Sequence, residues 1–291
     1  MTDATSQAPV SAITARKTWR TVEPLHGMVY FAPEAAESYE QLGLEGQSGY
    51  FASRSAPMGA VTPGTVVATF YNFEPSLVHR SMVGVWDNAF PSQVLTARVA
   101  AAGSALRRML GDAANSPEVA VAAELARIAA LAACEHPEGR PLFAGHAGLD
   151  WPDDPIEVLW HAQTLLREFR GDGHIALLVD HELDGLEALV MHEATGELPP
   201  AFLRATRGWS DEQWDTAIER LRGRGWLRPG GSAEPLALSD EGAAVRQAIE
   251  EATDRLTVVA YAAIGDDGCE SLRGLVRPWS RTVVASAGLG G

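Results

Sequence analysis

Prolines stand at the start of segments whose apolar residues recur every three or four positions, and this pattern extends along most of the chain. Pro33, Pro91, Pro117 and Pro155 each begin such a segment. Proline is favoured at the first position of a helix, and the spacing is that of a helix with one buried face. The sequence therefore predicts a mainly α fold with a multi-helix N-terminal domain, in which the longer helices cover 33–42, 75–88, 91–110, 117–131 and 155–169.

Residues 198–260 show a different order of elements. A short helix at 199–206 is followed by a tight turn and a second helix, and two short strands at 226–228 and 236–238 flank a turn rich in glycine. A further helix begins after Ser239. Helix, turn, helix, hairpin and helix follow one another in a winged helix. We therefore predict a C-terminal winged helix-turn-helix that carries a short β-hairpin.

The second helix of this segment has a clear start signal. Ser210 is followed three residues later by Gln213, which is the spacing of a capping box. Behind it, Trp214, Ile218 and Leu221 share one helical stripe. We expect these three side chains to be buried in the core rather than displayed for binding.

These patterns divide the chain into three parts. We expect a helical, ligand-binding domain over 14–196, a winged-helix domain over 197–260, and closing helices over 261–291. Glycines at 265 and 268 and the proline at 278 predict that the closing part is a pair of short helices.

The charge balance argues against a general nucleic-acid binder. The chain of 291 residues has a formal net charge of −15, whereas affinity for nucleic acid comes largely from cations that neutralise phosphates. The acidic Asp211 and Glu212 begin the helix that would contact base edges. Arg222, Arg224 and Arg228 are the candidate phosphate contacts, so DNA stays open as a partner but is disfavoured by charge.

The remaining composition indicates a soluble cytoplasmic protein. Two cysteines, Cys134 and Cys269, are too few for a disulfide scaffold and lack the spacing of metal ligands. The first twenty residues contain no apolar signal segment, and no run of about 18 uncharged apolar residues could span a membrane. No motif in the sequence indicates a particular cofactor or a metal.

Glycines, a carboxylate and a histidine are close together at 170–174, where the pattern predicts a junction between two helices. Asp172 could set the tautomer of His174, and His192 follows near the end of the next predicted helix. One interpretation is a plain helix cap with histidines on polar faces. The others are a ligand-binding site that includes Asp172, His174 and His192, and an acid–base pair of His174 and Asp172.

A group of aromatic residues in the N-terminal part suggests a second candidate site. Tyr30 and Tyr71 lie in stretches rich in Phe and Tyr, and His26 and Arg54 would supply polar groups. Such a mixture can line a pocket for an aromatic or amphipathic ligand, and it can also be core packing.

The stretches 24–27 (PLHG), 30–35 (YFAPEA), 49–57 (GYFASRSAP), 166–174 (LREFRGDGH), 183–187 (LDGLE) and 207–212 (RGWSDE) together resemble a family of actinobacterial winged-helix proteins with a MarR-like helix-turn-helix. The resemblance covers about residues 16–289. It implies a two-part α-rich fold with a C-terminal winged helix, it transfers no catalytic residue, and it favours a shared ligand pocket.

These observations lead to three functional hypotheses. We favour a protein that binds a small molecule in its helical domain. The first alternative is a ligand-responsive transcription regulator, which would bind DNA as a homodimer. The second is a small-molecule enzyme in which His174 is the general base and Asp172 orients it. No phosphate-binding loop, nucleophile motif or zinc signature supports a named reaction.

Overall fold

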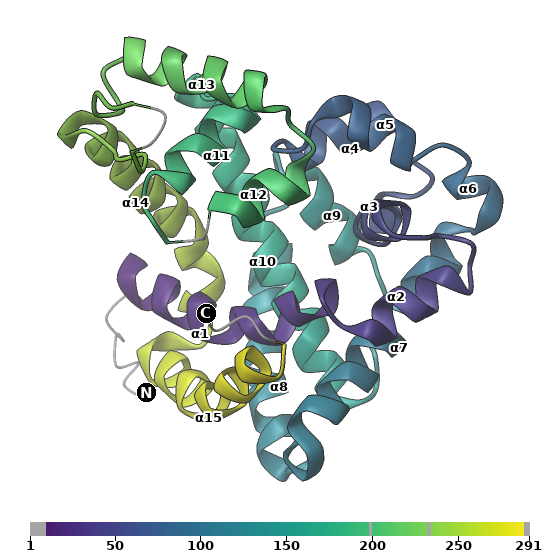
Figure 1. Ribbon diagram of the computed structural model, residues 1–291. Helices are drawn as coiled ribbons and strands as arrows, with labels where there is room; N and C mark the ends of the chain where they lie inside the picture. The colour runs from purple at the N-terminus through teal and green to yellow at the C-terminus, as the bar shows by residue number, and fades with distance from the viewer. Residues whose placement is uncertain (1–9, 198–199, 232–233, 288–291) are drawn as a thin grey trace. The chain divides into compact units, whose positions relative to one another are not determined.

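The computed structural model describes residues 10–197, 200–231 and 234–287 (Figure 1). They group into two compact units. The larger unit consists of the described residues up to Val61, Gly84–Asp172, and those from Asp254 onward. The smaller unit consists of Thr62–Val83 and the described part of Gly173–Thr253. Two helices, α10 (Pro155–Asp180) and α14 (Asp240–Ala262), contribute residues to both.

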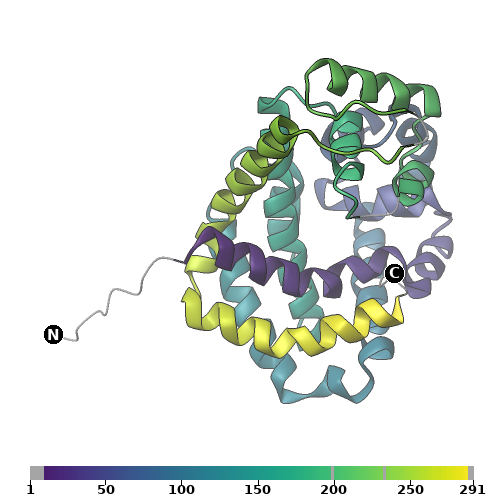
Figure 2. The ribbon, with the colours of Figure 1, turned by 60° about the vertical axis from the view of Figure 1, so that its left-hand side comes forward.

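The larger unit is a helical bundle in which the two ends of its chain pack together. The first helix lies alongside the last one, as both ribbon views show (Figures 1 and 2). Besides α10 and α14, its α-helices are α1 (Ala12–Gly27), α2 (Pro33–Glu40), α3 (Gln47–Ser55), α6 (Val85–Asn88), α7 (Pro91–Leu110), α8 (Pro117–Cys134), α9 (Pro141–Ala147) and α15 (Gly265–Ser286). Three 3-10 helices, Met28–Tyr30, Ala56–Met58 and Gly111–Asn115, continue α1, α3 and α7.

The smaller unit contains the helix-turn-helix, which corresponds to α12, the turn after it and α13. Its helices are α4 (Pro63–Phe70), α5 (Pro75–Ser81), α11 (Gly185–Glu193), α12 (Pro200–Arg207) and α13 (Asp211–Gly223). Helix α13 lies against α11 in the ribbon (Figure 1). Trp214, Ile218 and Leu221 of α13 belong to one apolar core with Leu186 and Leu189 of α11. The predicted burial of the α13 stripe is therefore confirmed.

Local start signals were predicted well. Helices α2, α7, α8 and α10 begin at the expected prolines. The hydroxyl of Ser210 accepts from the Gln213 N–H, and the Gln213 side chain accepts from the Ser210 N–H, which completes the predicted capping box.

The predicted β-hairpin is wrong. Across the described residues no strand forms, and Leu227 and Leu238 make only one isolated antiparallel bridge. The pairing cannot extend because the N–H of Trp226 donates to Leu221 O at the end of α13. On the other side, Pro229 and Pro235 have no N–H to donate. The fold is all-α with a helix-turn-helix and without the predicted wing hairpin.

Two predicted helix breaks are also absent. Helix α10 continues through Gly171 and Gly173, and α15 contains Pro278. A glycine costs a helix about 1 kcal/mol. Burying Phe169 and Leu178 on either side of the two glycines offsets that cost, since each large apolar side chain contributes about 1.5–3 kcal/mol.

The expected domains over 14–196, 197–260 and 261–291 stay a prediction. Across the residues that the structure describes, none of the helices combines the length and apolar character needed to cross a membrane.

Candidate functional site

The seven predicted ligand-binding residues lie in three places. His26, Tyr30 and Arg54 meet in a buried polar cluster of the larger unit. Tyr71, His174 and His192 line a cavity of the smaller unit. Asp172 lies beside the start of α9, where its carboxylate accepts from the Phe143 N–H at 3.0 Å and feels the charges of Glu168 and Arg54.

One chain of hydrogen bonds in the larger unit runs through His26. The hydroxyl of Thr164 donates to Trp160 O, so it accepts from Nδ1–H of His26 at 2.8 Å. Nε2 of His26 then accepts from the Tyr30 hydroxyl at 3.0 Å, and Arg167 donates to the same hydroxyl oxygen. Burial, followed by the nearby arginines, holds the pKa of His26 well below its usual value. His26 is therefore neutral and fully hydrogen-bonded.

A buried carboxylate joins two of the arginines in this cluster. Glu168 is 3% exposed, and its Oε1 lies 3.4 Å from Arg54 and 3.1 Å from Arg167. Burial opposes the charge of Glu168, but the two guanidinium groups outweigh it and lower the pKa to about 2. Arg54 also donates to the Tyr50 hydroxyl at 3.0 Å.

Sequence reasoning missed two members of this cluster, Arg98 of α7 and His146 of α9. Both are almost fully buried, at 1% and 2% exposure. Nε and Nη2 of Arg98 and both ring nitrogens of His146 lack a hydrogen-bond partner in the structure. A signal for Arg98 was present, because it lies four residues from both Val94 and Ala102 on the buried stripe of α7.

The smaller unit contains a cavity of about 310 Å³. Its walls come from the end of α4, the last turns of α10, and α11, α12 and α14. The lining residues are Phe70, Tyr71, Asn72, His174, Ile175, Leu178, Leu183, Ala188, Leu189, Met191, His192, Leu203, Arg207, Arg246, Ile249 and Glu250. Apolar walls with a few polar groups are typical of small-molecule sites, and the volume is at the lower end of their range.

Hydrogen bonds determine how the two cavity histidines present their nitrogens. The hydroxyl of Thr253 donates to Ile249 O, so it accepts from Nδ1–H of His174. Arg246 donates to Nδ1 of His192 at 3.3 Å, so the proton of that ring is on Nε2. Burial lowers the pKa of His192, and the charge of Arg246 lowers it further. The two rings therefore differ in their hydrogen bonding, because Nδ1 donates in His174 and accepts in His192.

The backbone at Tyr71 is strained. Its φ of +56° lies in the left-handed region that side-chain-bearing residues rarely adopt. The Tyr71 hydroxyl donates to Leu183 O, and its carbonyl packs so closely on α11 that a Cβ at Gly185 would lie 2.0 Å from it. Strain of this kind gathers at functional sites.

The predicted acid–base pair gains no support from the hydrogen bonds. Asp172 accepts from Phe143 N–H, whereas Nδ1 of His174 donates to Thr253. Both residues lie inside α10, and side chains two residues apart on a helix do not face each other. Burial raises the pKa of Asp172 to about 6, against the lowering effect of the Phe143 N–H.

A family model described as a helix-turn-helix family matches residues 15–290. The chain belongs to this helix-turn-helix family. The match confirms the helix-turn-helix part of the predicted resemblance and is compatible with a DNA-binding regulator. Membership of a MarR-like, actinobacterial group stays a prediction. Among curated proteins and among solved structures, none matches this chain.

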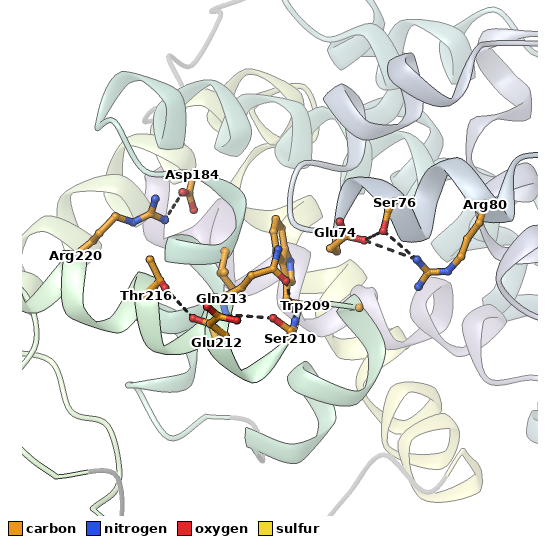
Figure 3. Close-up of a pocket in the computed structure, with 12 residues that line it drawn as sticks. Glu74, Ser76, Arg80, Asp184, Trp209, Ser210, Glu212, Gln213, Thr216 and Arg220 are labelled. Atoms are coloured by element: carbon orange, nitrogen blue, oxygen red, sulfur yellow. Dashed lines mark hydrogen bonds and ion pairs between the residues drawn. The ribbon is translucent and has the colours of Figure 1, made fainter.

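The outer face of the helix-turn-helix in this family member is acidic. A hollow of about 780 Å³ lies between α5, the turn before α13, and α13 itself (Figure 3). Its lining contains three carboxylates, Glu74, Asp184 and Glu212, against Arg80 and Arg220. Arg220 is itself paired with Asp184 at 2.5 Å, as the dashed line in Figure 3 marks.

The three arginines predicted to contact phosphates differ in how many bonds they already make within the protein. Arg222 pairs with Glu219 at 2.8 Å and donates to Gly230 O. Arg224 donates to the carbonyls of residues 181 and 182 and stacks on Trp226. Only Arg228 of the three is largely exposed, and its nearest carboxylate partner, Asp240, is 3.7 Å away. The helix-turn-helix surface therefore offers little cationic charge to a phosphate backbone.

Within the described part of the chain, no group of three or more His, Cys, Asp or Glu side chains is arranged to hold a metal ion.

Proposed function

We propose that this helix-turn-helix protein binds a small amphipathic molecule in the cavity of the smaller unit. The observation that carries the proposal is the cavity itself, in which aliphatic side chains surround a few convergent polar groups. Arg207, Arg246 and Glu250 are the charged residues of the lining, and Arg246 also pairs with Glu197 at 3.7 Å. This mixed lining favours an occupant with an apolar body and a polar end.

The cavity shares its walls with the core of the helix-turn-helix. Leu203 of α12 and Leu189 of α11 line the cavity and belong to the same apolar core as Trp214 of α13. An occupant would therefore contact side chains that hold α12 and α13 in place. This arrangement supports a sensor in which binding stabilises one arrangement of the helix-turn-helix.

A cavity-filling variant tests the proposal. The probe is 8-anilinonaphthalene-1-sulfonate, an amphipathic anion whose fluorescence rises in apolar surroundings. Ala188→Phe fills the cavity, and Ala248→Phe on exposed α14 is the matched control. We expect saturable binding to the wild type, roughly tenfold weaker binding to Ala188→Phe, and no change in Ala248→Phe. Equal binding by both variants, with circular dichroism unchanged, would contradict the proposal.

A DNA-binding regulator is the second candidate, because the family match favours it. The acidic face of α13 and the pairing of Arg220 and Arg222 oppose tight binding through phosphates. A homodimer and a cytoplasmic location stay predictions, and analytical ultracentrifugation of the full chain would test the first of them.

A further inference from the structure

The link between α4 and α5 in the smaller unit, residues 71–74, begins with a strained γ-turn. Tyr71 has a φ of +56° and a ψ of −51°, and the N–H of Asn72 donates to Phe70 O at 2.6 Å. A hydrogen bond between residues two apart closes a γ-turn, and the form with positive φ is rare and strained. Contacts with other segments must therefore hold Tyr71 in this conformation.

The first two residues of this link line the cavity of the smaller unit. Tyr71 and Asn72 both belong to its wall. The Tyr71 hydroxyl donates to Leu183 O, and Leu183 is another lining residue. An occupant of the cavity would therefore contact the residue in the γ-turn and also the residue to which its hydroxyl is bonded.

The same link is bonded to the helix-turn-helix. Asn72 O accepts from the indole N–H of Trp209 at 3.0 Å, and the N–H of Glu74 donates to Arg207 O at 2.9 Å. The guanidinium of Arg207 also lies 4.8 Å from the ring centre of Phe73. Arg207 is the last residue of α12, and Trp209 lies in the turn before α13. All three contacts of the link therefore fall where α12 ends and the turn begins.

Close packing on both sides leaves the link little room to move by itself. The carbonyl of Tyr71 packs directly on the backbone of Gly185, the first residue of α11. In the turn after α12, Gly208 has a φ of +81°, and a Cβ there would lie 2.8 Å from Cδ2 of Leu77 in α5. Packed interfaces change between discrete arrangements and do not deform smoothly. A change at the γ-turn would therefore also change the turn between α12 and α13.

We propose that the 71–74 link couples occupancy of the cavity to the turn of the helix-turn-helix. An occupant that packs against Tyr71 stabilises the strained γ-turn, and this γ-turn directs Asn72 O toward the indole of Trp209. Without an occupant, a relaxed conformation that lacks the Asn72–Trp209 bond is populated more. This inference rests on the function proposed above, because it requires an occupant in that cavity.

Titration of the full-length protein with 8-anilinonaphthalene-1-sulfonate tests the coupling from its remote end. Trp209 does not line the cavity, so Trp209→Phe leaves the wall intact and removes the indole bond to Asn72. Because coupling is reciprocal, this variant should bind the probe roughly fivefold more weakly than the wild type. Trp86→Phe is the matched control, since the Trp86 indole donates to Val61 O at 2.8 Å in the larger unit, and it should bind as the wild type does. Circular dichroism checks that each variant folds.

The outcomes separate this inference from the proposed function. If Ala188→Phe weakens probe binding but Trp209→Phe binds as the wild type does, the cavity site stands and the coupling is overturned. If the wild type shows no saturable binding, both are overturned. If Trp209→Phe does not fold, the NMR signal of the Trp209 indole N–H in the wild type decides the question. A shift of this signal on addition of the probe supports the coupling, and an unchanged signal contradicts it.

Discussion

In the larger unit, Arg98 is buried and Arg54 and Arg167 are partly buried around the ring of Tyr30, each with its guanidinium within 6 Å of the ring centre. In the smaller unit, Arg220 and Arg222 lie near the surface of the helix-turn-helix and are paired with carboxylates of the same unit. A protein that binds DNA through phosphates displays unpaired cations on its surface. This protein instead pairs Arg220 and Arg222 of its helix-turn-helix with carboxylates.

The comparison bears on DNA as a partner. Carboxylates of α13 would repel a phosphate backbone. The helix-turn-helix core and the arginine cluster each contain a buried side chain whose removal should lower the free energy of unfolding.

The largest expected effect concerns the core of the smaller unit. Trp214 is fully buried, and we expect Trp214→Ala to lower the free energy of unfolding by about 3–5 kcal/mol. Val83 of the same unit is 78% exposed, so Val83→Ala should cost about 0.5 kcal/mol or less. Urea unfolding followed by circular dichroism measures both. A Trp214→Ala protein as stable as the parent would show that α13 is not held by this core.

The second prediction compares a buried carboxylate with a surface one. Glu168→Gln removes the buried negative charge between Arg54 and Arg167, and we expect a loss of about 3 kcal/mol, although Arg167 keeps its pair with Glu23. Glu219→Gln removes the exposed partner of Arg222, and its cost should be about 0.5 kcal/mol or less. Similar losses of unfolding free energy in the two variants would contradict the claim that the buried carboxylate contributes more to stability than the exposed one.

The third prediction concerns pH. Burial lowers the pKa of His146 to about 3, so the folded protein binds fewer protons there than the unfolded chain does between pH 3 and 6.5. Its contribution to stability is therefore lost as the pH falls below 6.5, by about 1.3 kcal/mol between pH 7.5 and 5.5. His146→Gln should remove that part of the acid sensitivity.

Two features of this pH experiment make it decisive. The raised pKa of Asp172 acts in the opposite direction, but it is common to both proteins, so the difference between them isolates His146. His79→Gln changes an exposed histidine of the smaller unit and should keep the wild-type slope. A wild-type slope in His146→Gln would show that the His146 ring is not held neutral by burial.

Local signals predicted the starts of the helices, and they failed where packing between distant segments decides the outcome. The capping box at Ser210 depends only on Gln213, three residues away, so it could be predicted from the sequence. The continuity of α10 through Gly171 depends on the burial of Phe169 and Leu178, which no local pattern shows. The predicted wing hairpin does not form, because the N–H of Trp226 donates to Leu221 O at the end of α13.

The candidate sites show the same division. His26, Tyr30 and Arg54 were chosen for their chemistry, and the structure brings them together. His146 lies on α9, far from those residues in the sequence, so only the fold could add it. A charged residue on the apolar stripe of α7 was the signal that could have identified Arg98.

Fluorescence anisotropy of labelled genomic DNA fragments tests most directly the claim that the helix-turn-helix surface offers little cationic charge to DNA. At about 150 mM salt we predict weak binding by the wild type. A variant that combines Glu212→Arg, Asp215→Arg and Glu219→Arg replaces the acidic face of α13 with cations and should bind roughly tenfold more tightly or better. Nanomolar, steeply salt-dependent binding by the wild type would contradict the account.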